Sequence, residues 1–182
     1  AAPVVDAGSI DFGCDDAPPQ AKLLDGALHS VVFGPTHVLR PTWHFARAED
    51  IGWLLDLTGP RVRRVTGQQL RTAHGLDERA IEHAVGAVTQ ALGSRGELTR
   101  AQLGAELRDR GGRTTGQMLM ILLAHVELDG LICSGRLVDG EHSYALLAER
   151  VPSPHRLGRA EALAELALRY FTGHSPATER DL

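Results

Sequence analysis

Polar side chains that can meet a phosphate or orient a water molecule are concentrated in the segment Thr36-His37-Val38-Leu39-Arg40-Pro41-Thr42-Trp43-His44-Phe45. A histidine within a hairpin, such as His37 or His44, either contacts a phosphate and helps to orient water, or packs and hydrogen-bonds structurally. Thr42, between the two histidines, belongs to the same candidate set. Two histidines without a third ligand do not predict a metal site, and no cofactor is expected.

Arginines supply the second kind of candidate, because a guanidinium binds phosphate through several donors. Arg40 either binds phosphate or braces a carboxylate such as Asp50. The basic run Arg61-Val62-Arg63-Arg64 has two open interpretations. In the first, Arg61, Arg63 and Arg64 contact phosphate. In the second, the run is a solvated helix end or linker.

A third group lies at the start of a predicted helix, where backbone N–H groups and short polar side chains suit phosphate or base-edge contact. Its members are Arg113, Thr114, Thr115 and Gln117. Capping alone explains the two threonines. Arg113 and Gln117 either contact nucleic acid or form a solvated face.

One more basic side chain, Arg136, lies beside a predicted turn, and such a turn can place an arginine in the minor groove of DNA. Asp139 and Glu141 lie on the same loop and repel phosphate. The loop is therefore predicted to contribute little binding.

Composition limits these candidates to local surfaces, because the formal net charge of the chain is -4. Cys14 and Cys133 are the two cysteines, and their spacing is not that of a metal or redox pair, so we expect a reducing, cytoplasmic setting. No apolar run approaches the roughly 20 residues that span a membrane, so no membrane partner is expected.

The elements that must position these residues are clearest in the middle of the chain. Apolar residues at helical spacing predict helices over 77–92, 99–110 and 115–129, with Asp77 and Thr99 as N-caps. A hairpin is predicted over 131–147, with its turn between Gly135 and Gly140. This order predicts a complete winged helix-turn-helix domain over residues 76–148.

The preceding residues predict a partial winged-helix unit over 21–60, after a loose segment at 1–20. It contains a short helix at 20–29, two strands separated by Gly34-Pro35, and a helix that starts near Asp50 and stops at Gly59-Pro60. Pro41 predicts an edge or a bulge. Residues 61–75 are expected to be a linker.

The residues after the hairpin predict another linker over 149–158 and the start of a further, truncated winged-helix unit over 159–182. Arg159 to Phe171 has helical spacing, and Thr178-Glu179-Arg180-Asp181-Leu182 repeats the pattern Thr99-Arg100-Ala101-Gln102-Leu103. The predicted fold class is α+β, mainly helical, with tandem winged helix-turn-helix domains and β-hairpin wings, in what we expect is a fragment of a longer protein.

These motifs resemble one known family. The segment 36–45 and three later segments are similar to the winged-helix DNA glycosylases of the AlkZ and YcaQ type. The later segments are, in order, Glu49-Asp50-Ile51, then His125-Val126-Glu127-Leu128-Asp129-Gly130-Leu131-Ile132-Cys133-Ser134-Gly135, and then Arg169-Tyr170-Phe171-Thr172-Gly173-His174-Ser175-Pro176-Ala177-Thr178. The resemblance covers roughly residues 20–182. It implies duplex DNA as the partner and, in enzymatic members, excision of alkylated or cross-linked bases.

The catalytic motif that the resemblance implies, Gln-x-Gln or Gln-x-Asp ahead of residue 37, is missing from this chain. The resemblance therefore assigns no catalytic residue, and whether the protein is an enzyme stays open. The leading interpretation is a DNA-binding, repair-related protein of the nucleoid with little sequence preference. The alternative is a non-enzymatic transcriptional regulator or a scaffold with a protein partner.

Overall fold

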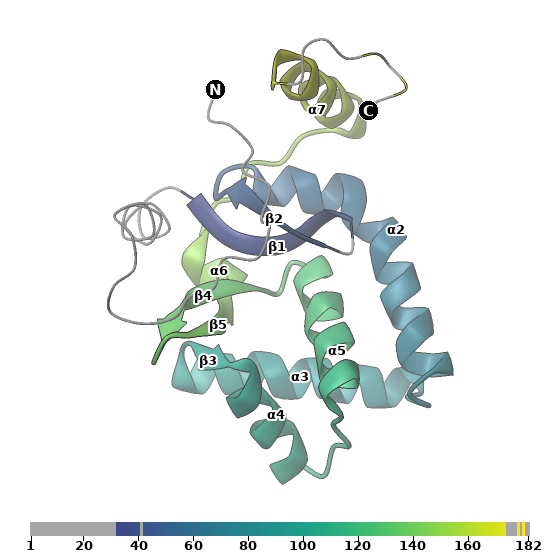
Figure 1. Cartoon of the computed structure of the whole chain (residues 1–182), viewed down its shortest axis with the longest axis vertical. Helices are drawn as coiled ribbons and strands as arrows, with labels where there is room; N and C mark the ends of the chain where they lie inside the picture. The colour runs from purple at the N-terminus through teal and green to yellow at the C-terminus, as the bar shows by residue number, and fades with distance from the viewer. Residues whose placement is uncertain (1–31, 41, 174–177, 179, 181–182) are drawn as a thin grey trace.

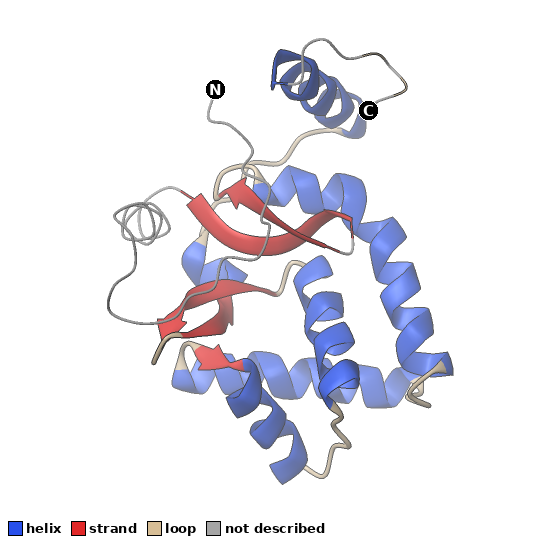
Figure 2. Cartoon of the chain, in the orientation of Figure 1, coloured by secondary structure: helices blue, strands red, loops and turns tan. Residues whose placement is uncertain are grey.

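The computed structural model describes residues 32–40, 42–173, 178 and 180. These residues form helices and two small antiparallel sheets, so the chain is a mainly helical α+β protein, as the sequence predicts (Figure 2). The segment 1–20 and the helix predicted at 20–29 lie outside the described residues. None of the described helices is long and apolar enough to span a membrane.

The three helices predicted over residues 77–129 are present, and their caps are the predicted ones. They are α3 (Glu78–Arg95), α4 (Arg100–Asp109) and α5 (Gly116–Leu128). Asp77 accepts a hydrogen bond from the Ala80 N–H at 2.8 Å, and Thr99 forms a complete capping box with Gln102. Of the two candidate threonines, Thr115 caps α5 by accepting from the Met118 N–H at 3.2 Å.

The predicted hairpin is also present, and it joins a third strand that the sequence analysis missed. The strands are β3 (Leu98–Thr99), β4 (Ile132–Val138) and β5 (Glu141–Leu146), in the order β3-β5-β4. The turn is shorter than predicted. It consists of Asp139 and Gly140, whose φ angles of 52° and 80° are those of the tight turn that Asp-Gly favours.

A second hairpin, formed by β1 (Val32–Arg40) and β2 (Thr42–Arg47), precedes the helices. The prediction that Gly34-Pro35 separates its strands is wrong, because both residues lie inside β1. The register shifts between Phe33 and Pro35, as at a bulge, and a bulge accommodates a proline that cannot donate to the ladder. The turn falls between Arg40 and Thr42; Pro41 itself lies outside the described residues.

The largest correction concerns α2 (Ile51–Thr72), which continues through Pro60. Residues 61–72, expected as a linker, are its second half. A proline inside a helix removes one backbone hydrogen bond and bends the axis, and Figure 1 shows α2 bending about half-way along its length. Packing offsets this cost, because Val62, Thr66 and Leu70 recur every four residues and are buried.

The hairpin β4–β5 separates two hydrophobic clusters, because its side chains alternate between its faces. Ile132 and Tyr144 face the cluster formed with α3, α4 and α5. Cys133 and Ala145 face a second cluster, which contains Trp53 from the first half of α2. The first half of α2 therefore covers one face of the sheet, and the three helices cover the other.

The C-terminal part consists of α6 (Leu147–Arg150), irregular residues 151–158, and α7 (Arg159–Gly173). The helix predicted from Arg159 to Phe171 is thus confirmed. Gly52 permits the irregular segment to approach α2, because a Cβ there would lie 2.6 Å from the His155 carbonyl oxygen. Ala162 is the buried residue of α7 and joins the cluster around Trp53.

Candidate nucleic-acid interface

The turn between α4 and α5 presents the third group of predicted residues at the surface. Arg113, Thr115 and Gln117 are exposed. Thr114 is half-buried, and its hydroxyl accepts a hydrogen bond from Arg108 at 3.1 Å. The side chains of Arg113 and Gln117 are therefore available to a ligand, whereas the two threonines hold the turn and the helix start.

The C-terminal half of α5 packs against the second half of α2. Thr66 Oγ1 and His125 Nδ1 form a buried hydrogen bond of 2.8 Å between the two helices. A Cβ at Gly67 would lie 3.3 Å from His125 Cε1, and one at Gly59 would lie 3.1 Å from the Leu128 carbonyl oxygen. Small residues on α2 thus bring the two helix backbones close together.

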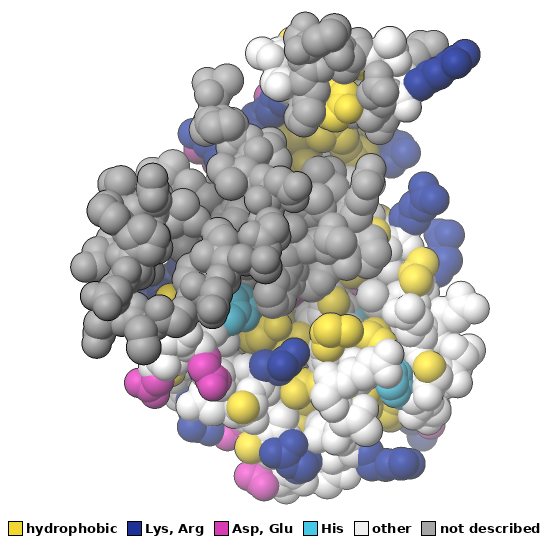
Figure 3. Space-filling model, in the orientation of Figure 1, with side chains coloured by type: hydrophobic (Ala, Val, Ile, Leu, Met, Phe, Trp, Pro, Cys, Tyr) yellow, Lys and Arg dark blue, Asp and Glu magenta, His cyan; other side chains and the backbone are white. Residues whose placement is uncertain are grey.

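The basic run divides between structural and outward-facing side chains. Arg63 forms an ion pair with Asp129 at the end of α5. Arg61 and Arg64 are exposed on the opposite side of α2, and neither forms an ion pair with another residue that the structure describes. Figure 3 shows Lys and Arg side chains at the right-hand edge of the molecule, on the side where Figure 1 places the bend of α2.

The tip of the hairpin β4–β5 has mixed charge, as predicted. The Arg136 side chain is exposed, and its backbone N–H donates to Glu97 Oε2 at 2.8 Å. Asp139 and Glu141 are exposed beside it. The tip thus offers one cation and two carboxylates to a ligand.

The segment with the two histidines lies on the hairpin β1–β2. Thr36 pairs with His44, and Arg40 pairs with Thr42 at the closed end of the hairpin. His37 lies inside β1. The hairpin brings Arg40, Thr42 and His44 to one region of the backbone, where the sequence analysis expects contact with phosphate.

Sequence reasoning missed the group that holds Asp50. This buried carboxylate accepts hydrogen bonds from Trp53 Nε1 at 3.0 Å and from Arg169 of α7. The Arg169 guanidinium also lies over the Trp53 ring, 5.5 Å from its centroid. Burial opposes ionisation of Asp50, but the hydrogen bonds from Arg169 and Trp53 and the charges of Arg169 and Arg47 together outweigh burial and lower its pKa.

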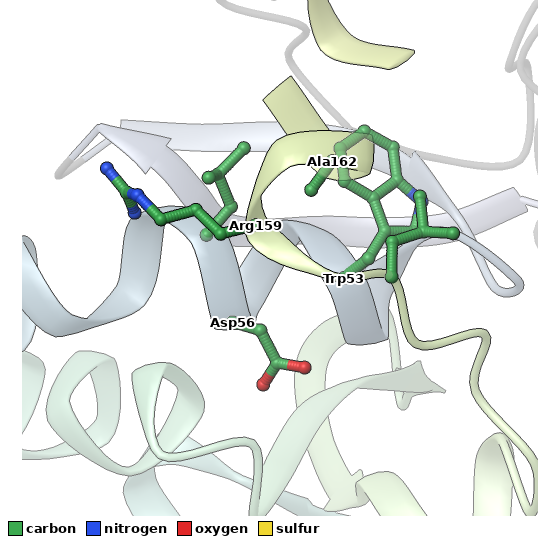
Figure 4. A pocket seen from close by; sticks show the side chains of 6 residues that line it. Trp53, Asp56, Arg159 and Ala162 are labelled. Atoms are coloured by element: carbon green, nitrogen blue, oxygen red, sulfur yellow. The ribbon is translucent and has the colours of Figure 1, made fainter. Parts of the chain in front are cut away.

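A pocket of about 120 Å³ lies between α2 and α7 next to this group. Figure 4 shows the Trp53 ring and Ala162 together on one side and the Arg159 guanidinium pointing away on the other. Asp56, Leu57 and Leu157 complete the lining, which therefore combines apolar side chains with one carboxylate and one guanidinium. Within the described part of the chain, no three His, Cys, Asp or Glu side chains gather as metal ligands.

The buried contact between α2 and α5 predicts that stability depends on pH. Burial lowers the pKa of His125; the charge of Asp129 opposes the shift, and that of Arg63 adds to it. The folded protein therefore holds the neutral ring, whereas the unfolded chain binds a proton near its ordinary pKa of about 6.5. We expect stability to be retained above about pH 6.5 and to fall as the pH drops below that value.

Urea denaturation at several pH values between about 7.5 and 5 measures this dependence. His125→Gln should flatten the profile. Burial also lowers the pKa of His142, so His142→Gln should remove a separate part. A His125→Gln profile that coincides with that of the unmodified protein contradicts the assignment.

Comparison with known proteins places these features in context. The family model described as "DNA glycosylase AlkZ-like" matches residues 20–182. The solved structure of Streptomyces sahachiroi DNA glycosylase AlkZ superposes with a TM-score of 0.64 at 20% sequence identity, over 89% of this chain. The chain spans 45% of the length of that protein. No curated protein matches the sequence.

Proposed function

The chain belongs to the AlkZ-like family of DNA glycosylases, and from that premise we propose that it binds duplex DNA as a tandem winged-helix protein with little sequence preference. DNA as the partner would place the protein in the cytoplasm, on the nucleoid. Its function would be that of a DNA-binding part of a repair protein.

The observation that carries this proposal is the connection of the elements between α3 and β5. Three helices, with a short strand between the first two, are followed by a hairpin whose second strand lies at the centre of the sheet. A helix-turn-helix extended by a hairpin is the winged-helix arrangement, which is widely used on DNA. We therefore propose residues 76–148 as the complete domain and α7 as the first helix of a further one.

We assign no catalytic residue. Cleavage of a glycosidic bond needs groups that stabilise a cationic sugar and activate water. The Gln motif that the resemblance implies for these roles does not occur in the sequence, and His37 and His44 remain the polar candidates in the matching segment. Catalysis by this chain would need other groups.

A second candidate, a scaffold that binds a protein partner, is favoured by the burial of α5. Nine of its residues are buried, so little of this helix is left to read DNA. The two candidates differ in their response to salt, since binding to phosphates releases counterions and a mainly apolar protein contact does not.

The expected result is DNA binding that weakens steeply with salt. The contacts assigned to Arg40, Arg61, Arg64 and Arg113, with a smaller share from Arg63, would neutralise about 3 to 5 phosphates. The slope of log affinity against log salt should then be about -3 to -4, so that affinity falls roughly 60- to 250-fold between 50 and 200 mM salt.

Titration of two labelled duplexes of unrelated sequence, with fluorescence anisotropy as the readout, measures both slope and preference. The two duplexes should bind within a few-fold of each other. Absence of binding at low salt, or a slope near zero, would instead support the scaffold.

A further inference from the structure

The second half of α2 packs against the C-terminal half of α5, the helix that a groove-reading winged helix would present to DNA. We infer that duplex DNA lies across the outer face of α2, held through its phosphates by Arg61 and Arg64, and that the C-terminal half of α5 does not enter the groove. The inference rests on the proposed function and names the surface that performs it.

Most of α5 is buried. Its buried residues continue from Met118 to Leu128, interrupted by Met120 and Ile121. The Thr66–His125 hydrogen bond and the close approach at Gly59 hold α2 against it. A single helix has a diameter of about 10–12 Å, and the major groove is about 12 Å wide. One helix fits, but two helices packed together do not.

The second half of α2 carries positive charge on its outer face. From Leu57 to Thr72 the helix contains no acidic residue. Arg61 and Arg64 lie one turn apart, about 4.5 Å along the axis, and Gln68 follows on the same face. The remaining arginines of this half are engaged, Arg63 with Asp129 and Arg71 with Glu78. The outer face is therefore a positive stripe complementary to a phosphate backbone.

The alternative surface is less suitable. The tip of β4–β5 places Asp139 and Glu141 beside Arg136, and like charges repel phosphate. The first turn of α5 offers Arg113 and Gln117. Such a surface can supplement the stripe on α2, but the two carboxylates at the hairpin tip oppose contact with the backbone of a duplex.

Two double variants with the same loss of charge separate the two surfaces. Arg61→Gln/Arg64→Gln removes the stripe on α2, whereas Arg113→Gln/Arg136→Gln removes one cation from the turn before α5 and one from the hairpin. All four side chains are exposed, so both variants should fold, and thermal unfolding checks this. Because the net charge changes equally, long-range attraction to DNA is matched.

The 182-residue chain and both variants are titrated with the two duplexes at several salt concentrations. We expect the α2 variant to lose about tenfold in affinity at about 100 mM salt, with a slope shallower by about 1 to 2 units and the same loss on both sequences. The matched variant should lose clearly less.

The reverse order, with the α2 variant binding like the unmodified chain and the matched variant losing most, overturns the inference and leaves the proposed function intact. If the unmodified chain binds neither duplex at low salt, the proposed function fails, and the inference fails with it. Equal losses would also overturn it, because the stripe would then have no special part in binding.

Discussion

Replacement of Trp53 by alanine is expected to lower the free energy of unfolding by about 3 to 5 kcal/mol. The side chain is 1% exposed and lies in the cluster between α2, the hairpin β4–β5 and α7. Its removal leaves a large cavity, takes one donor from the buried Asp50 carboxylate and removes the aromatic face beneath Arg169.

Urea denaturation followed by circular dichroism measures this loss. Leu168→Ala on α7 is the control, because this leucine is 64% exposed and its truncation should change stability by less than about 0.5 kcal/mol. If the Trp53→Ala variant loses less than about 1 kcal/mol, the second cluster does not contribute to folding as the packing implies.

Leu122→Ala is expected to cost about 2 to 5 kcal/mol. Leu122 is fully buried on α5 in the cluster with α3 and α4, where a truncated side chain leaves an unfilled volume. Met120 is two residues away on the same helix and is 50% exposed, so Met120→Ala has a similar effect on helix propensity but should change stability little.

The comparison of these two variants tests the orientation of α5 directly. Equal losses would mean that the helix does not present Leu122 to the interior and Met120 to the surface. Such a result would also weaken the argument that α5 is covered, because that argument depends on the same orientation.

Features that depend on neighbouring residues could be predicted from the sequence. Each N-cap is an interaction across three residues, so Asp77 and Thr99 identify helix starts without reference to the rest of the fold. The same holds for the helix stops near Gly111 and Gly130, which have positive φ angles. The Asp139-Gly140 turn carries an equally local signal, because Asp-Gly favours a two-residue turn.

Features that depend on distant residues could not be predicted. Gly59, Pro60 and Gly67 normally oppose a helix, and the close approach of α5 at Gly59 and Gly67 cannot be read from local spacing. The two residues of β3 are too few to show a pattern, and their partners lie in β5.

The candidate site divides in the same way. The residue types of the site could be read from the sequence, but their ion pairs and hydrogen bonds could not. Arg63 is 66 residues from Asp129, and Arg169 is 119 residues from Asp50. No spacing rule connects residues so far apart in the sequence. The ion pair of Arg169 with Asp50 therefore could not be predicted, and Arg40 is the candidate nearer to Asp50 in sequence.

The attachment of α7 has a mechanical consequence. A helix held by one contact can rotate about that contact, whereas a helix held by two contacts cannot. Ala162 is buried in the cluster around Trp53, and Arg169, two turns further on and about 10 Å along the axis, is bonded to Asp50. Both the tilt and the roll of α7 are thereby set by the first half of α2.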